Sequence, residues 1–151
     1  MKIEFVGKCL LLEKDGERAL VVGDLHIGYE EYLNRAGVFV SRKMYDEMIK
    51  EFDEIFAKIG GVHKIVLLGD VKHDFGMIMK QEWKEIIDLF NYLEKKCDEI
   101  IVLRGNHDKI LEPVLIRKEI LLRDFFIWRE FCFLHGERNF AEIYDKKIKF
   151  W

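Results

Sequence analysis

Short apolar runs and amphipathic segments alternate along the chain, which predicts alternating strands and helices. The expected strands are the apolar runs at residues 9–13, 18–22, 64–68 and 100–103. The expected helices, in which apolar residues recur every three or four positions, lie at residues 41–59 and 80–96, with a loop and a short helix at 25–36. The first two strands flank a turn at residues 14–16 and predict a β-hairpin. The remaining order of strand, helix, strand, helix, strand is typical of an α/β fold with a mainly parallel sheet.

The second half of the chain has a different pattern. After Pro113, residues 119–128 and 130–134 are two adjacent apolar and aromatic runs, which predict an antiparallel pair from a second sheet. Residues 147–151 alternate polar and apolar positions like a strand that has only begun. We therefore expect residues 1–151 to be a single domain that lacks its C-terminal part.

Length and composition are those of one globular domain with a sizeable core, since the chain has 151 residues and is 50% apolar. Its 25 Lys and Arg and 28 Asp and Glu give a net charge of −3, so phosphate binding would have to come from a local site. No apolar run is long enough to cross a bilayer and the N-terminus lacks the apolar region of a signal peptide, so we expect a soluble cytoplasmic protein. The scarcity of Asn and Gln and the abundance of Lys and Glu resemble hyperthermophile proteins, which is a hypothesis about the source.

The rarest residue types exclude several classes of enzyme. The chain contains no Thr and a single Ser, and Ser41 stands where the helix at 41–59 is expected to have its N-cap. Hydrolases with a hydroxyl nucleophile and Walker-type nucleotide sites are therefore excluded. The three cysteines are far apart and form no CxxC pair, which argues against a disulfide framework or a four-cysteine zinc site.

Three of the predicted strands lead directly into a glycine followed by polar residues. These clusters are Gly23-Asp24-Leu25-His26, Gly69-Asp70-Val71-Lys72-His73 and Gly105-Asn106-His107-Asp108. Because ligands bind at the carboxyl ends of the strands in an open α/β sheet, we expect the three clusters to converge on one rim. A fourth cluster, in which His135 follows an apolar strand and precedes a glycine, is similar.

The residue types in these clusters are those of a metal site. Asp24 and His26 are two residues apart, so on an extended chain both side chains point the same way and can bind one ion. Asp70 can bridge two ions, and Asn106 offers an amide oxygen while its neighbour His107 is left for proton transfer. Carboxylate, imidazole and amide ligands without thiolates suit Mn²⁺, Fe or Zn²⁺ rather than a Ca²⁺ site made only of oxygens.

For four further polar residues the sequence either leaves two roles open or indicates only a surface position. His73 either contacts the substrate or supports a metal ligand, or it caps a turn. Lys72 and Arg104 either bind phosphate or are charges in solvent at strand ends. His63 has no partner in the sequence, and we expect it on the surface.

The motifs GDLH, GDVKH, GNHD and FLHGE, in this order, resemble those of the calcineurin-like metallophosphoesterases. The pattern of that superfamily is D-x-H, G-D, G-N-H-[DE], H and G-H-x-H, and the chain is most similar to the small ICC-like phosphoesterases of archaea and bacteria. The resemblance extends from Gly23 to His135. It implies a four-layer αββα sandwich, of which this chain would hold mainly the first sheet with its helices and the start of the second sheet.

The resemblance also implies a role for each matching residue. Asp24 and His26 would hold a first metal ion, Asp70 would bridge both ions, and Asn106 and His135 would hold the second. The implied cofactors are two divalent ions, with Mn²⁺ favoured and Fe, Zn²⁺ and Ni²⁺ as alternatives.

The resemblance also implies residues for proton transfer, and the chain departs from the family pattern in one respect. His107 would act as the acid near the substrate, and Asp108 would orient it. No G-H-x-H motif follows His135, so the chain is either a fragment or a protein with a weakened site.

These observations predict a metal-dependent phosphoesterase. Its expected substrate is a phosphate ester, with phosphodiesters or nucleic-acid ends favoured by family analogy alone. The alternatives are a catalytically weak or truncated phosphoesterase scaffold that serves as a binding module, and an inactive fragment. No membrane partner is expected, and a homo-oligomer stays open.

Overall fold

The computed structural model describes residues 1–73 and 80–136. Within them the strands are β1 (Lys2–Val6), β2 (Cys9–Lys14), β3 (Glu17–Val22), β4 (Val62–Leu67), β5 (Cys97–Leu103), β6 (Leu122–Arg123), β7 (Phe125–Trp128) and β8 (Phe131–Leu134). The helices are α1 (Tyr29–Arg35), α2 (Met44–Ile59), α3 (Lys80–Leu93) and α4 (Glu112–Arg117), the last preceded by a 3₁₀ turn, η1 (Asp108–Leu111). The expectation for residues 147–151 falls outside the described part of the chain.

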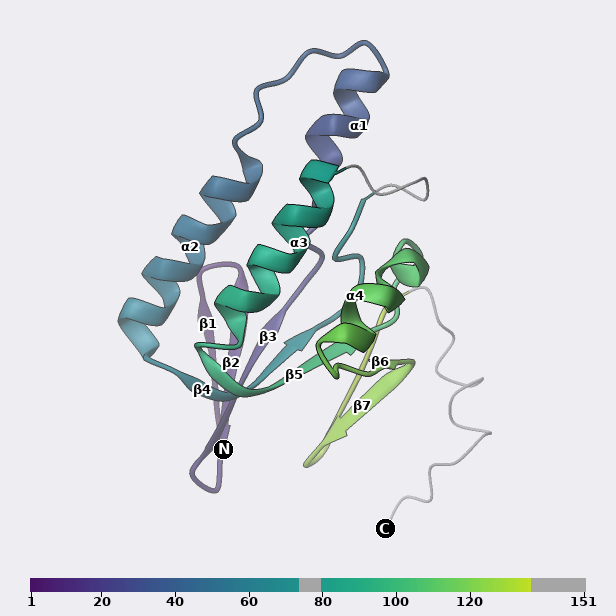
Figure 1. Cartoon of the computed structure of the whole chain (residues 1–151). Helices are drawn as coiled ribbons and strands as arrows, with labels where there is room; N and C mark the ends of the chain where they lie inside the picture. The colour runs from purple at the N-terminus through teal and green to yellow at the C-terminus, as the bar shows by residue number, and fades with distance from the viewer. Residues whose placement is uncertain (74–79, 137–151) are drawn as a thin grey trace.

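The main sheet has six strands in the order β1-β2-β3-β4-β5-β6. The first three strands pair antiparallel, and β3, β4, β5 and β6 pair parallel. Because the strands follow one another in sequence order, successive crossovers of one hand place their helices on the same face of the sheet. Figure 1 shows α2 and α3 side by side across that face, and a ring contact between Phe52 and Tyr92 joins them.

Two apolar cores lie on the two faces of the main sheet. The larger core packs α2, α3 and α4 against the sheet, and Phe56, Ile65 and Phe90 belong to it. The smaller core lies on the opposite face, where Trp128 and Phe133 of the antiparallel pair β7-β8 cover Val66 and other residues of the sheet. The described residues thus form a helix layer, a six-stranded sheet and a small second sheet, which confirms the predicted fold class.

The structure corrects several predicted boundaries. Only residues 125–128 of the expected strand at 119–128 belong to the second sheet, because Leu122–Arg123 pairs with β5 in the main sheet. Strand β1, which pairs with β2, was not predicted from the sequence. Helix α4 was not predicted either: Pro113 lies in its first turn, a position to which proline is well suited.

The N-terminus of α2 is capped by a residue that the sequence did not indicate. Ser41 is not the cap: the helix begins at Met44, and no side chain of its N-cap residue Lys43 makes the capping bond. Instead, Glu30 Oε1 accepts hydrogen bonds from the backbone N–H groups of Lys43 at 2.8 Å and Met44 at 3.0 Å. Helix α1 therefore satisfies donors that α2 cannot satisfy internally.

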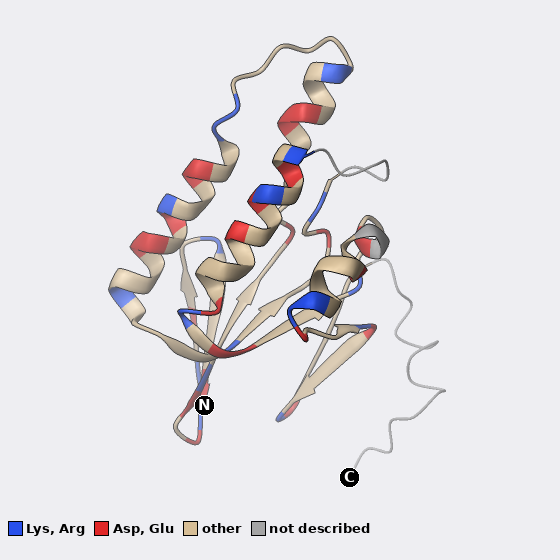
Figure 2. Ribbon diagram, in the orientation of Figure 1, with Lys and Arg blue, Asp and Glu red and all other residues tan. Residues whose placement is uncertain are grey.

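Charged side chains are concentrated outside the sheet. Figure 2 shows both signs of charge along α2 and α3, whereas the central strands of the sheet are largely uncharged. In the part of the chain that the structure describes, no helix combines the length and apolar character needed to span a bilayer.

We predict that Glu30→Ala lowers the free energy of unfolding by about 1 kcal/mol, because two backbone donors at the start of α2 lose their acceptor. Ser41→Ala is the matched control and is expected to change it by less than about 0.5 kcal/mol. Urea denaturation followed by circular dichroism measures both values. A larger loss for Ser41→Ala than for Glu30→Ala would contradict the capping assignment.

Candidate metal centre

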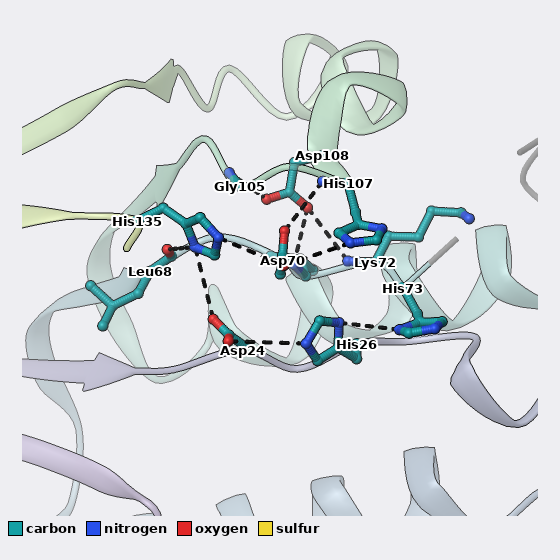
Figure 3. Close-up of polar contacts among 11 residues, drawn as sticks. Asp24, His26, Leu68, Asp70, Lys72, His73, Gly105, His107, Asp108 and His135 are labelled. Atoms are coloured by element: carbon teal, nitrogen blue, oxygen red, sulfur yellow. Dashed lines mark hydrogen bonds and ion pairs between the residues drawn. The ribbon is translucent and has the colours of Figure 1, made fainter. Parts of the chain in front are cut away.

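The carboxyl ends of β3, β4 and β5 lie side by side at one edge of the sheet. Val22, Leu67 and Val102 are neighbours in the parallel register, and each stands just before one of the polar clusters. The structure therefore brings together loops that are far apart in the sequence, as the sequence analysis expected. Figure 3 shows their side chains facing a common space, with His135 approaching from the end of β8.

Two glycines allow the loops after β4 and β5 to approach each other. Gly69 has a φ of 102°, and a Cβ added to it would lie 2.8 Å from the backbone nitrogen of Gly105 and 2.8 Å from His135 Nδ1. A Cβ on Gly105 would overlap the backbone nitrogen of Asp70. A side chain at either position would force the two loops apart.

Asp70 lies at the centre of this arrangement. Its own φ is 45°, a left-handed conformation that is uncommon outside glycine and is often found at functional sites. Its carbonyl oxygen accepts hydrogen bonds from the backbone N–H groups of Leu25 at 3.2 Å and His26 at 2.9 Å. Its Oδ1 accepts one from the backbone N–H of His107 at 3.2 Å. Asp70 thus ties together the loops that follow β3, β4 and β5.

The second carboxylate oxygen of Asp70 faces two imidazoles. Its Oδ2 lies 3.9 Å from His107 Nε2 and 3.7 Å from His135 Nε2. Two ligands that each lie about 2.1 Å from one ion are separated by about 3 to 4 Å, so the spacing between Asp70 and His135 suits ligands that share an ion. The Asp70 side chain is only 8% exposed, so its charge is poorly solvated without a cation.

Asp24 faces the same space from the loop after β3. Its Oδ2 lies 4.0 Å from His26 Nε2, and its Oδ1 lies 3.9 Å from His135 Nδ1. Asp24 and His26 therefore lie close enough to share an ion. The expected cause, an extended chain that points both side chains the same way, is wrong. The φ of His26 is 49°, so the chain there is not extended.

The hydrogen bonding of His135 indicates which of its nitrogens can bind a metal ion. His135 Nδ1 lies 2.9 Å from the carbonyl oxygen of Leu68, and a carbonyl oxygen only accepts hydrogen bonds, so Nδ1 carries the proton. In a neutral ring the lone pair is then on Nε2, the atom nearer to Asp70. Backbone carbonyls commonly fix metal-binding histidines in this way. The sequence contained no signal for the contribution of Leu68.

The side chain of Asn106 also has the chemistry of a metal ligand. Its Oδ1 is buried and accepts no hydrogen bond from the residues described, which is costly for an amide oxygen without a cation. Asn106 lines a cavity of about 380 Å³ together with Asp24 and His135. These donors therefore fit a divalent ion, although no three His, Cys, Asp or Glu side chains within residues 1–73 and 80–136 already converge as a complete metal site.

Asp108 holds two of the loops in place. It is fully buried; Oδ1 accepts hydrogen bonds from the backbone N–H groups of Val71 and Lys72, and Oδ2 accepts one from Gly105 at 3.0 Å. Burial raises the pKa of its carboxyl above the usual value, while the bond from Gly105 opposes this shift. These contacts make Asp108 a positioning residue for the loops after β4 and β5. Its predicted role in orienting His107 stays a prediction.

Lys72 is buried rather than displayed to a substrate. Its side chain is 0% exposed, and its Nζ lies 3.8 Å from Oε2 of Glu82, which is also buried. The Glu82 carboxylate fills the space beside Gly28, where a Cβ would overlap it. The ion pair therefore joins the start of α3 to the loops after β3 and β4. No sequence pattern predicted the burial of Glu82, since nothing in a helical pattern shows that a carboxylate faces inward.

Two other residues considered in the sequence analysis, Arg104 and His63, make ordinary ion pairs and hydrogen bonds. Arg104 lies between Glu112 at 3.5 Å and Asp124 at 3.3 Å, so its guanidinium already forms ion pairs with two carboxylates. Its placement does not support the predicted phosphate contact. His63 is exposed and accepts a hydrogen bond from the backbone N–H of Arg18, which agrees with the expected surface position.

His73 belongs to an aromatic cluster beside the candidate ligands. Its Nδ1 lies 3.4 Å from His26 Nδ1, and its ring meets those of Tyr29 and Tyr32 edge-on, with centroids 4.5 and 5.0 Å away. His73 also stacks on His107 at 5.7 Å. A cavity of about 550 Å³ begins at Asp24, His26 and His73 and extends between α1, α2 and α3. The loop sequence did not predict that α1 supplies two tyrosines here.

Residues 17–150 match the family model of the calcineurin-like phosphoesterases. The chain belongs to this family. The match covers most of the sequence and confirms the resemblance that the four motifs indicated.

A solved structure with the same fold is the nuclease MPE from Pseudomonas putida. The two chains superpose with a TM-score of 0.56 at 17% sequence identity. The alignment covers 81% of this chain and 63% of the nuclease, so this chain spans less than two thirds of its length. No curated protein matches the sequence.

We predict that Lys72→Met lowers the free energy of unfolding by roughly 3 to 5 kcal/mol, because the buried Glu82 carboxylate loses the ammonium group beside it. Glu82→Gln is expected to lower the free energy of unfolding by less. The double variant is expected to lose less than the sum of the two single losses. Denaturant titration of the four proteins completes the cycle. Strictly additive losses would show that the two side chains do not stabilise each other.

Proposed function

We propose that this protein is a metal-dependent phosphoesterase that hydrolyses a phosphate ester, with a phosphodiester or a nucleic-acid end as the favoured substrate. The observation that carries the proposal is the placement of Asp70. Its buried carboxylate faces His135 on one side and His107 on the other. Asn106 Oδ1, which has no partner among the residues described, belongs to a residue that lines one cavity with Asp24 and His135. Family membership supports the reaction class.

The candidate ligands fall into two sets that share Asp70. Asp24, His26 and Asp70 would hold one divalent ion, and Asp70, Asn106 and His135 would hold the other. Mn²⁺ suits this mixture of oxygen and nitrogen donors best, and Fe, Zn²⁺ and Ni²⁺ are alternatives. When bound, two such ions supply an acidified water and positive charge for the phosphoryl oxygens.

His107 is the residue that we assign to proton transfer. Its backbone N–H is held by Asp70 Oδ1, and its side chain remains 17% exposed, so the imidazole is fixed and still accessible to a substrate. A protonated imidazole can donate its proton to the leaving oxygen of the ester. His73, stacked on the His107 ring, restricts the orientation of the imidazole.

The cavity of about 550 Å³ beside Asp24 and His26 supports binding of the organic group of the ester there. Tyr29, Tyr45 and Met48 give it apolar and aromatic walls, and several carboxylates also line it. One of them is Glu85, whose pKa is raised by burial and by nearby carboxylates such as Glu30. Because these carboxylates repel further phosphates, the cavity favours the end of a chain or a small diester over a continuous nucleic-acid strand.

The structural neighbour described as a nuclease supports a nucleic-acid-related substrate by fold analogy alone. The alternative is a binding module built on a phosphoesterase scaffold. The binding module stays an alternative because, within the described ranges, no three His, Cys, Asp or Glu side chains are already placed to hold one metal ion.

We predict that Asp70→Asn and His107→Ala each reduce the Mn²⁺-dependent hydrolysis of bis(4-nitrophenyl) phosphate by at least about a hundredfold. Asp70→Asn weakens the ligand that both ions would share, and His107→Ala removes a positioned acid, which usually contributes about that much. His63→Ala removes an exposed imidazole far from the three loops and is expected to retain full activity. Release of 4-nitrophenol measures all three variants. Retention of wild-type rates by both Asp70→Asn and His107→Ala would rule out the proposed function.

A further inference from the structure

Strand β1 forms an open edge of the main sheet. It pairs with β2 on one side, and no strand pairs with its outer side within residues 1–73 and 80–136. Three apolar side chains of this edge are exposed: Met1 by 64%, Ile3 by 51% and Phe5 by 82%. An exposed edge with apolar side chains is a common template for pairing with another strand, and proteins usually protect such edges.

The turn between β1 and β2 shows which backbone groups face outward. Val6 and Cys9 are paired across the two-residue loop Gly7-Lys8, and Gly7 has a φ of 58°, as at the first position of a type II′ turn. The pair that closes such a hairpin is hydrogen bonded, and hydrogen-bonded pairs alternate along an antiparallel ladder. Val6, Glu4 and Lys2 therefore bond to β2, whereas Ile3 and Phe5 direct their N–H and C=O groups to the open side.

We propose that β1 pairs antiparallel with β1 of a second copy of this chain, about a twofold axis at Ile3. Only odd-numbered residues of this edge direct their N–H and C=O groups outward. In the register centred on Ile3, these groups of one copy face those of the other along the whole strand. Ile3 then faces Ile3 of the second copy, and Met1 faces Phe5. The same register sets Lys2 opposite Glu4 of the second copy, and Glu4 opposite its Lys2.

Charge complementarity selects the second copy as the partner. Lys2 and Glu4 are side by side on the strand, with Nζ and Oε2 2.8 Å apart, and Glu4 Oε1 also lies 3.5 Å from Lys58 Nζ of α2. Lys2 and Glu4 both remain accessible, at 66% and 34% exposure of their side chains. In the antiparallel register each charge meets its opposite at both ends of the pairing. A parallel pairing in register would set Lys2 beside Lys2 and Glu4 beside Glu4, which is destabilising.

The apolar side chains lie on a face that such a dimer would extend. Ile3 is opposite Leu12 and Phe5 is opposite Leu10 in the ladder with β2. Leu12 belongs to the core beneath β7 and β8, and Leu10 packs against that core. Pairing of two copies would therefore align two apolar sheet faces, with an identical patch on both subunits as a twofold dimer requires. Figure 1 shows β1 at the side of the sheet away from β5 and the site loops.

The test compares four charge variants of the full chain by analytical ultracentrifugation. The wild type is expected to form a dimer at micromolar concentration. Lys2→Glu and Glu4→Lys each place like charges opposite each other at both ends, so each is expected to raise the dimer Kd by roughly tenfold. The double variant Lys2→Glu with Glu4→Lys restores opposite charges and is expected to return close to the wild-type Kd. Lys50→Glu, an exposed charge reversal on α2, is the matched control for net charge.

A further variant tests the backbone pairing. Ile3→Pro removes an N–H that faces outward, so the monomer is expected to fold, as circular dichroism can show, while the dimer is lost. The proposal is overturned by a monomeric wild type, by single variants that dimerise normally, or by a double variant that fails to recover. Unfolding of Ile3→Pro would also overturn it, because that N–H would then bond to β2.

Discussion

The site depends on the close approach of two loops, those that follow β4 and β5. Gly69 and Gly105 are in contact, and neither has room for a side chain. This contact lets Asp70 adopt its left-handed conformation and reach the loop after β3 with its carbonyl oxygen and the loop after β5 with its carboxylate. The strands supply the parallel register, but the two glycines bring the polar side chains within range of a common ion.

Several buried polar groups outside the candidate metal centre hold these loops in position. Asp108 bonds to backbone amides of both loops, and the ion pair between Lys72 and Glu82 joins the loop after β4 to the start of α3. Each of these groups carries a desolvation cost, which the fold tolerates because its partners are in place. The side chains of the candidate metal centre are thus supported by residues that take no part in the centre itself. Such support keeps ligands within the narrow range of positions that metal binding requires.

The sequence predicted the central parts of the fold because their patterns are local. The strand runs, the α2 periodicity and the polar residues after each strand follow from neighbouring residues, and the parallel register then determines that Asp24, Asp70 and Asn106 converge. The cap on α2 by Glu30 and the burial of Lys72 against Glu82 depend on residues distant in sequence, so no local pattern contained them. The left-handed backbone of His26 likewise occurs where its N–H bonds to Asp70, a residue distant in sequence.

The central claim is that the three loops and His135 form one centre for two metal ions with Asp70 between them. Isothermal titration of the metal-free chain with Mn²⁺ tests this claim most directly, because it counts the ions without depending on a substrate. We predict two sites per chain in the wild type, and the loss of both from Asp70→Asn, since both ligand sets share that carboxylate. No binding, or a single weak site unaffected by Asp70→Asn, would contradict the account.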